Sequence, residues 1–165
     1  NEQGKPFVGQ AGNFLDQLLE AAGLKRSEVF ITNVVKCRPP KNRDPEPEEL
    51  SLCRRYLDRQ IEIIDPKIIV TLGRFSMARF VENGRIGAIH GQTHPVDGRT
   101  VITMYHPAAA LHQPGLKSTL LADFAGIQRV LGKMGRTPQE PKAQNAEPTQ
   151  EKEEDKSTPE QLSLF

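Results

Sequence analysis

The chain has 165 residues and a formal net charge of +1, and 36% of its residues are hydrophobic. This length predicts one domain of ordinary size followed by a tail. Because no apolar run is long enough to cross a bilayer and residues 1–5 are polar, we expect neither a membrane span nor a signal peptide, and we expect a soluble, cytoplasmic protein.

Charge is distributed unevenly along the chain. From Gly135 onward there are four basic and seven acidic residues, so this part carries −3 and the part before it carries +4. A mildly basic body suits a polyanionic partner. The two cysteines are too few for the disulfide framework of a small secreted protein.

In chain order, the first predicted element is a helix over residues 13–22, where apolar side chains recur at spacings of three and four and Gly23 follows as a terminator. A β-branched, apolar run predicts a strand over residues 29–35. A loop rich in proline and charge covers residues 39–47.

A second helix begins at Glu48, with acidic residues in its first turn, and Pro66 closes it. The apolar run 68–72 predicts a strand, which is followed by Gly73 and a helix over about 75–81. After a glycine-rich connection come a third strand over residues 100–105 and a last helix over residues 117–131.

Strands that alternate with helices predict an α/β fold with a parallel sheet covered on both faces, in which sites form at the carboxyl ends of the strands. Asn33, within the first predicted strand, and His106, just past the third, stand out there.

The tail differs in composition from the body. Residues 135–160 contain almost nothing apolar and cannot bury enough surface to offset the entropy lost on ordering, so we expect a disordered acidic linker after a folded domain of residues 1–134. Residues 161–165, Gln-Leu-Ser-Leu-Phe, then place three large apolar side chains at the terminus.

A glycine-rich stretch, Gly-Lys-Pro-Phe-Val-Gly-Gln-Ala-Gly, covers residues 4–12 ahead of the first helix. Backbone amides in such a loop can approach an anion, and the same composition also forms plain tight turns, which are far commoner. Phe7, held between the glycines, is either a stacking platform or a plug in the core.

Asn33 interrupts an otherwise apolar predicted strand. A buried amide without partners costs about 1–3 kcal/mol, so this side chain must bond to something. It either bonds to a loop or reads a nucleobase edge, to which a carboxamide offers a donor and an acceptor side by side.

Cys37 and Cys53 lie 16 positions apart, separated by the proline-rich loop. They are either two buried thiols or metal ligands; an iron–sulfur cluster normally takes four sulfur ligands, and the chain has two. His106 precedes Pro107, which favours an extended conformation at the strand end, where a histidine can be structural or catalytic.

Together these stretches resemble the family 4, iron–sulfur uracil-DNA glycosylases, from Gly4 to about Leu131. The residues that carry the resemblance are, in order, the glycine-rich stretch 4–12, Thr-Asn-Val-Val-Lys-Cys-Arg-Pro-Pro-Lys-Asn-Arg at 32–43, Cys53, Leu72-Gly73, and Tyr-His-Pro-Ala at 105–108. Each motif is modest, and their order and spacing together make the resemblance specific.

The resemblance implies an enzyme of base-excision repair that hydrolyses the N-glycosidic bond of uracil in DNA. Phe7 would stack on the extruded uracil, Asn33 would read its edge, and His106 would stabilise the negative charge that develops on uracil as the bond breaks. Cys37 and Cys53 would be two of the four ligands of a structural 4Fe-4S cluster.

The resemblance also implies a monomer with three layers, α/β/α, around a central, mostly parallel four-stranded sheet. A cluster would pin the loop 38–43, so that Arg38, Lys41 and Arg43 lie along phosphates. Leu111, in the loop after His106, is the candidate for a wedge that enters the vacated base stack.

The sequence departs from the family upstream of Phe7. Members carry there a first strand with a Gly-Glu-x-Pro-Gly-like loop that helps to position the attacking water, preceded by two further cluster cysteines, and the sequence given has neither. We therefore expect an N-terminally truncated chain that lacks the first strand and is weakly active or inactive.

The terminal pentapeptide, with Gln161, Leu162, Leu164 and Phe165, resembles the peptide that bacterial DNA-processing proteins insert into the sliding clamp. An apolar group beyond an acidic, disordered tether has no core to join and suits a tethered anchor. It implies a bacterial, nucleoid-associated protein.

Two other functions stay open. One is a non-catalytic DNA-binding module on the same fold, carried to replication sites by the clamp peptide. The other is a small-molecule enzyme built on the glycine-rich loop, which would act on free nucleotides and not on uracil in DNA.

Overall fold

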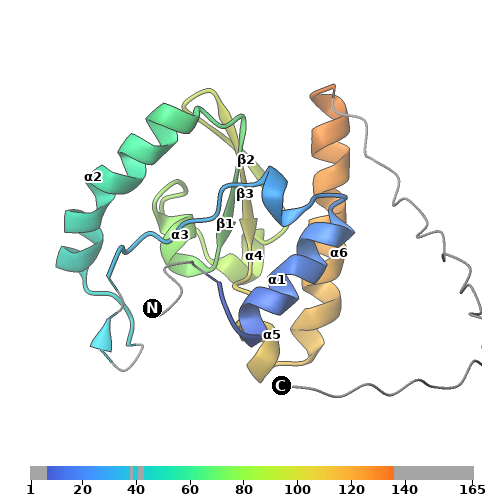
Figure 1. The fold of residues 1–165 in the computed structure, drawn as a ribbon, viewed down its shortest axis with the longest axis horizontal. Coiled ribbons are helices and arrows are strands. Elements are labelled where there is room, and N and C mark those ends of the chain that lie inside the picture. Colours follow the sequence, from blue (N-terminus) through green and yellow to red (C-terminus); the bar gives the residue numbers. More distant parts are fainter. Residues whose placement is uncertain (1–6, 38, 41–42, 136–165) are drawn as a thin grey trace, which may run out of the picture.

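The protein's structure, a computed structural model, describes residues 7–37, 39–40 and 43–135. Its elements are α1 (Gln10–Ala21), the 3-10 helix η1 (Arg26–Glu28), α2 (Pro47–Ile64), β1 (Ile68–Leu72), α3 (Arg74–Ala78), α4 (Ile86–Ile89), β2 (Thr93–Val96), β3 (Arg99–Met104), α5 (Ala109–His112) and α6 (Gly115–Lys133). The sheet stands between α1 and α6 on one side and α2 and α3 on the other (Figure 1). The predicted α/β class is confirmed.

The sheet is mixed. Its strand order is β1-β3-β2, with β1 parallel and β2 antiparallel to β3. The described sheet thus has three strands, in line with a four-stranded sheet that lacks its first strand, but the prediction of mostly parallel pairing is wrong for these residues. The sequence pattern hides β2, because its four residues contain Pro95, which lacks an amide hydrogen. A proline is tolerated there because β2 is an edge strand.

Residues 29–35, predicted as a strand, form an irregular segment instead. Val29 and Ile31 are half-buried and pack against the core. A strand persists only where a neighbour satisfies its backbone N–H and C=O groups, and none of the described strands pairs with this segment. Its β-branched composition therefore produces packing without pairing.

The core lies between α1, α6 and β3. The two helices run side by side along one side of the sheet (Figure 1). Both agree with the predicted helices 13–22 and 117–131: α1 begins three residues earlier and ends one residue earlier than predicted, and α6 is two residues longer at each end. The most deeply buried side chains of this core are Leu18, Ile102, Met104, Leu120 and Phe124. Close packing of this kind holds β3 rigid, and with it the residues that follow β3.

Helix α2 is attached to the body differently. Leu57 is its buried residue, and ion pairs join Asp58 to Arg79 at 2.6 Å and Asp65 to Arg99 at 2.8 Å. Several of its apolar side chains are exposed: Leu52, Tyr56, Ile63 and Ile64. In the described part of the chain, α2 is thus held more by charge than by apolar burial.

Some predicted features lie outside the described residues: Arg38, Lys41, the linker beyond Gly135, and the clamp-binding residues Gln161, Leu162, Leu164 and Phe165. Among the helices that the structure describes, none is both long and apolar enough to cross a membrane.

Candidate active site

The carboxyl ends of β1 and β3 meet at one edge of the sheet. Leu72 is in register with Met104, and the amide of Gly73 donates a hydrogen bond of 2.8 Å to the carbonyl of Met104. The segments that follow the two strands therefore leave the sheet together. One begins at Gly73, and the other carries His106, as the sequence predicts.

The imidazole of His106 is half-buried and held at one nitrogen. Its Nδ1 accepts a hydrogen bond of 3.1 Å from the amide of Ala108. A nitrogen that accepts carries no proton, so the proton of the neutral ring resides on Nε2. Burial lowers the pKa of His106 below its ordinary value, which favours this neutral form near pH 7. Nε2–H is then a donor suited to an oxygen that gains negative charge.

Gly73 makes room for His106. Its φ is 85°, a left-handed conformation that favours glycine, and a Cβ at this position would stand 3.1 Å from the Cβ of His106. The Leu72-Gly73 motif contributes to the family resemblance, but its role beside His106 does not follow from the sequence. A glycine directly after an apolar strand is the signal that points to such a close approach.

The ring of Phe7 stacks on the ring of His106, with centroids 5.4 Å apart and planes inclined by 24°. This separation is that of a direct aromatic pair. A base therefore has no room between the two rings as they stand. The predicted meeting of Phe7 and His106 is observed, although the two residues lie 99 positions apart in the chain.

The backbone around Phe7 is held against α1. Phe7 has a φ of 55°, uncommon for a residue with a side chain. Its carbonyl accepts a hydrogen bond of 3.2 Å from Arg26, which also pairs with Asp16 at 2.8 Å. A Cβ on Gly12 would overlap the same carbonyl, so the loop lies on the helix closely enough to require glycine there. Arg26 is thus a site residue that the sequence did not reveal.

Asn33 is exposed and lies in the irregular segment, so the prediction of a buried strand amide is wrong. Because none of the described strands pairs with this segment, no neighbouring strand covers the Asn33 side chain. Among the contacts of the described residues, none joins its side chain to Phe7 or His106. The structure brings two of the three predicted base-contacting residues together, and it leaves the Asn33 carboxamide open to solvent.

A polar cluster formed by Thr32, Lys36 and Gln60 anchors this segment to α2. The Lys36 ammonium donates to Thr32 Oγ1 and to the Asn33 carbonyl, both at 2.8 Å, and to Gln60 Oε1 at 2.7 Å. Thr32 Oγ1 also donates to Gln60 Oε1 at 3.2 Å. Partial burial lowers the pKa of Lys36. Lys36 belongs to the motif of residues 32–43, but its contact with Gln60 of α2, 24 positions away, does not follow from the sequence.

The two cysteines are not the buried pair that is their commonest alternative. Cys37 is exposed and Cys53 half-buried. The amide of Lys36 donates to the Cys53 sulfur at 3.2 Å, the kind of N–H···S contact that iron–sulfur ligands accept. This contact and the adjacency of Lys36 and Cys37 suit a shared metal centre. Two thiols remain half of a four-sulfur set, and the described residues hold no group of three or more potential metal ligands.

The candidate DNA contacts differ in availability. The Arg43 guanidinium binds both carboxylate oxygens of Glu49, at 2.8 and 2.9 Å, and this bond raises the pKa of Arg43 and lowers that of Glu49. A phosphate would have to compete with Glu49 for Arg43.

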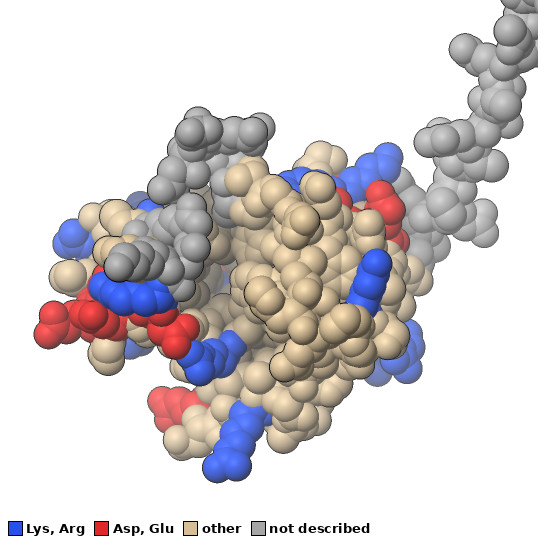
Figure 2. Space-filling view, turned by 90° about the horizontal axis from the view of Figure 1, so that it is seen from below, with Lys and Arg blue, Asp and Glu red and all other residues tan. Residues whose placement is uncertain are grey.

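Leu111 belongs to α5 instead of the predicted loop, and 45% of it is exposed, as a wedge requires. In the view of Figure 2, the basic side chains do not form one continuous patch, and some of them lie next to acidic side chains.

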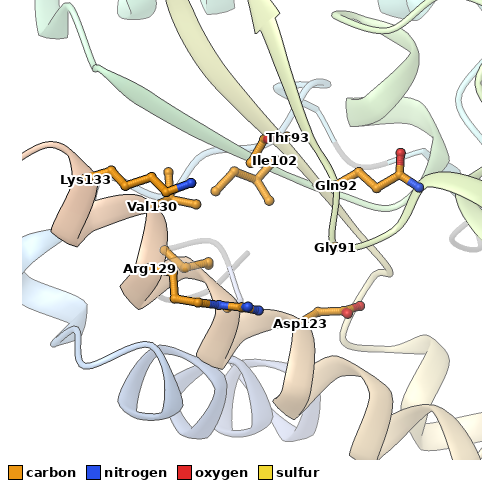
Figure 3. A pocket seen from close by; sticks show the side chains of 10 residues that line it. Gly91, Gln92, Thr93, Ile102, Asp123, Arg129, Val130 and Lys133 are labelled. Atoms are coloured by element: carbon orange, nitrogen blue, oxygen red, sulfur yellow. The ribbon is translucent and has the colours of Figure 1, made fainter.

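A separate cavity of about 480 Å³ lies between α6 and the β2 side of the sheet (Figure 3). Its lining includes Gln92, Asp123, Arg129 and Lys133, and none of the predicted site residues. At its wall, Asp123 bonds His90 at 2.7 Å. This cavity is therefore distinct from the Phe7–His106 pair.

Similarity to known proteins extends over most of the chain. The family model of the uracil DNA glycosylase superfamily matches residues 1–125. The type-4 uracil-DNA glycosylase of Sulfurisphaera tokodaii is 49% identical over 140 residues, which cover 79% of this chain and 64% of that relative. The type-4 uracil-DNA glycosylase of Archaeoglobus fulgidus is 46% identical over 141 residues, which cover 79% of this chain and 70% of the relative. The chain thus spans less than two thirds of the Sulfurisphaera tokodaii relative.

Proposed function

Because the chain belongs to the uracil DNA glycosylase superfamily and to its type-4 family, we propose that it removes uracil from DNA by hydrolysing the N-glycosidic bond. The observation that carries this proposal is the pair formed by Phe7 and His106 at the carboxyl edge of the sheet. It joins an aromatic face to a neutral imidazole whose Nε2–H can donate a hydrogen bond.

The base must first leave the helix. Uracil inside a duplex is unreachable, and extruding it costs a few kcal/mol, which stacking and hydrogen bonds in the site must offset. Stacking of a base on an aromatic ring contributes about 1–3 kcal/mol. Phe7 supplies this surface, either with its outer face or by moving off His106 as the base enters.

Asn33 reads the base. Its carboxamide presents a donor and an acceptor, which complement the N–H and carbonyl that uracil shows side by side on one edge. Cytosine shows a different pattern there and would leave a site dipole unpaired. The exposed side chain and the anchored backbone of Asn33 suit this role.

His106 acts on the leaving base. As the bond between sugar and base weakens, the sugar becomes oxocarbenium-like and uracil becomes an anion. Nε2–H of His106 donates a hydrogen bond to a uracil oxygen and stabilises that charge. Water adds to the anomeric carbon and loses a proton, and the uracil anion takes up a proton, so that the net reaction is hydrolysis without a redox change.

Cys37 and Cys53 supply two ligands of a 4Fe-4S cluster. The cluster, when bound, has a structural role, since hydrolysis transfers no electrons. The N–H···S bond from Lys36 to Cys53 supports this assignment. The bond joins Cys53 to Lys36, which is three residues from Asn33 in the chain.

Contacts with DNA complete the proposed function. Leu111 would enter the stack that the base has left, and Arg38, Lys41 and Arg43 would contact phosphates, Arg43 after exchange from Glu49. A tether ending in Gln161, Leu162, Leu164 and Phe165 binds the bacterial sliding clamp.

The test is uracil release from a labelled oligonucleotide by the full-length protein, purified without oxygen. We expect Asn33→Ala to lower release by about 10- to 100-fold, the loss of one or two hydrogen bonds, while DNA binding survives. Asn13→Ala, an exposed asparagine on α1, is the matched control and should match the unsubstituted protein.

The outcomes separate the three functions. Unchanged release by Asn33→Ala would remove its role as a base reader. Binding without release by the unsubstituted protein would favour the DNA-binding module. Turnover of free nucleotides with none on DNA would favour the small-molecule enzyme.

A further inference from the structure

The segment that carries Asn33 has no partner strand among the described strands, so something other than a sheet must hold it. The backbone amide of Lys36 donates to the Cys53 sulfur of α2 at 3.2 Å, and the side-chain hydrogen bonds around Asn33 centre on the ammonium of the same residue. An ammonium has three N–H donors. In Lys36 they meet three acceptors: Thr32 Oγ1, the Asn33 carbonyl and Gln60 Oε1.

Gln60 is the member of this cluster that lies on another element. Its Oε1 accepts from both Lys36 Nζ and Thr32 Oγ1, which uses both lone pairs of the oxygen. The residue is half-buried, and the bonded Thr32 lies 28 positions away along the chain. One oxygen on α2 thus holds two points of the segment on either side of Asn33.

Helix α2 can hold Gln60 in a fixed position, because α2 is itself joined to the rest of the domain. The ion pairs of Asp58 with Arg79 and of Asp65 with Arg99 join α2 to the α3 and β3 regions on both sides of Gln60 in sequence. Since β3 leads into His106, the same framework supports both residues. Asn33 is joined to this framework through the side chains of Lys36 and Gln60, whereas His106 is joined to it through the backbone of β3.

We propose that Gln60 is a positioning residue for uracil recognition, acting through Lys36 and Thr32 to hold the Asn33 peptide unit. This inference rests on the proposed role of Asn33 as the base reader. Gln60 itself touches no substrate. Losing its oxygen removes two of the bonds that tie the segment to α2 and leaves the bond from the Lys36 amide to the Cys53 sulfur in place, so the segment is held less firmly and the carboxamide of Asn33 spends less time where a base can meet it.

Three variants of the full-length protein test this proposal. Gln60→Leu removes the acceptor, and Gln60→Glu keeps an oxygen acceptor for the same two donors. Arg59→Leu is the matched control, since it places a leucine at the neighbouring, exposed position of α2. We expect kcat/KM for uracil release to fall about tenfold in Gln60→Leu, because Lys36 and Thr32 both lose an acceptor, and to stay near the original in the other two.

A double-mutant cycle distinguishes positioning from general destabilisation. If Gln60 acts through Asn33, adding Gln60→Leu to Asn33→Ala causes little further loss, because the contact it positions is already gone. Independent, multiplicative losses would overturn the proposal, as would full activity of Gln60→Leu. Should Gln60→Leu fail to fold, Thr32→Val removes the neighbouring hydroxyl and enters the same cycle.

The two levels of the proposal fail differently. An unsubstituted protein that releases no uracil contradicts the proposed function, and this inference with it. An active protein in which only Asn33→Ala impairs release supports the function and refutes the role of Gln60.

Discussion

The chemistry of His106 depends on which of its two nitrogens is occupied. Ala108 bonds Nδ1, and burial lowers the pKa of the ring, so Nε2 carries the donor proton. The sequence predicts the position of this residue after a strand. Its tautomer and its shifted pKa follow only from the contacts of the folded chain.

The lowered pKa predicts a pH-dependent stability. In the unfolded chain this histidine takes up a proton near its ordinary pKa of 6.5, whereas in the folded protein it does so only at lower pH. The unfolded state therefore binds more protons in that interval, and stability falls as the pH drops from about 6.5 through the lowered pKa. Thermal unfolding between pH 7.5 and 5 should show a smaller decline for His106→Gln than for the original protein. Equal declines in the stability of the two proteins would contradict the prediction that His106 causes part of this pH dependence.

Gly73 gives a second prediction at this scale. In Gly73→Ala, the left-handed φ of 85° and the Cβ at 3.1 Å from His106 are both unfavourable. We expect a loss of about 1–3 kcal/mol in the free energy of unfolding, measured by urea denaturation, together with slower uracil release. Gly98→Ala is the control: its φ is 74° but no atom lies within 4 Å of the added Cβ, so it should reduce stability without slowing release.

Among the elements, α1 and α2 show two ways of attaching a helix. The α1 stripe of Phe14, Leu15, Leu18 and Leu19 enters the core, as its periodicity predicts. The apolar positions of α2 read similarly in the sequence, yet Leu52 and Ile63 are 70% and 69% exposed. Periodicity shows that a helix has an apolar face, whereas the neighbouring elements decide whether that face is covered.

This contrast predicts unequal effects of leucine truncation within α2. Leu57 is 8% exposed, and Leu57→Ala should cost about 2–3 kcal/mol, the low end for buried leucines, because α2 packs loosely. Leu52→Ala should change stability by no more than about 0.5 kcal/mol. Chemical denaturation of both variants checks this, and similar losses would show that the face around Leu52 is covered in solution.

For the whole molecule, the proposed clamp peptide is the feature that acts independently of the fold. As proposed, a short anchor at the end of a long acidic segment would raise the local concentration of the chain at the clamp without contacting the proposed active site. Binding and catalysis are therefore expected to separate cleanly.

Deleting residues 161–165 should abolish binding to a purified bacterial sliding clamp and leave uracil release from short oligonucleotides unchanged. Deleting residues 146–150, five linker positions, is the control and should preserve both. Persisting clamp binding after the terminal deletion, measured by pull-down, would disprove the anchor.

Sequence patterns within short stretches of the chain determined several of its helices and strands and the place of His106. The periodicity of α1 and α6, the apolar run of β1, and the placement of His106 after β3 all depend on residues near one another in the chain, and each was confirmed. The family, too, could be identified from motifs in order, and the comparisons confirm it.

Only the tertiary structure decided which distant groups meet. It paired β2 antiparallel to β3, left residues 29–35 without a strand, stacked Phe7 on His106, and bound Lys36 to Gln60. Composition favours a strand or a site, but backbone pairing and side-chain contact require a partner at the right distance, and that partner comes from elsewhere in the chain. Such contacts exist only once the whole domain has folded.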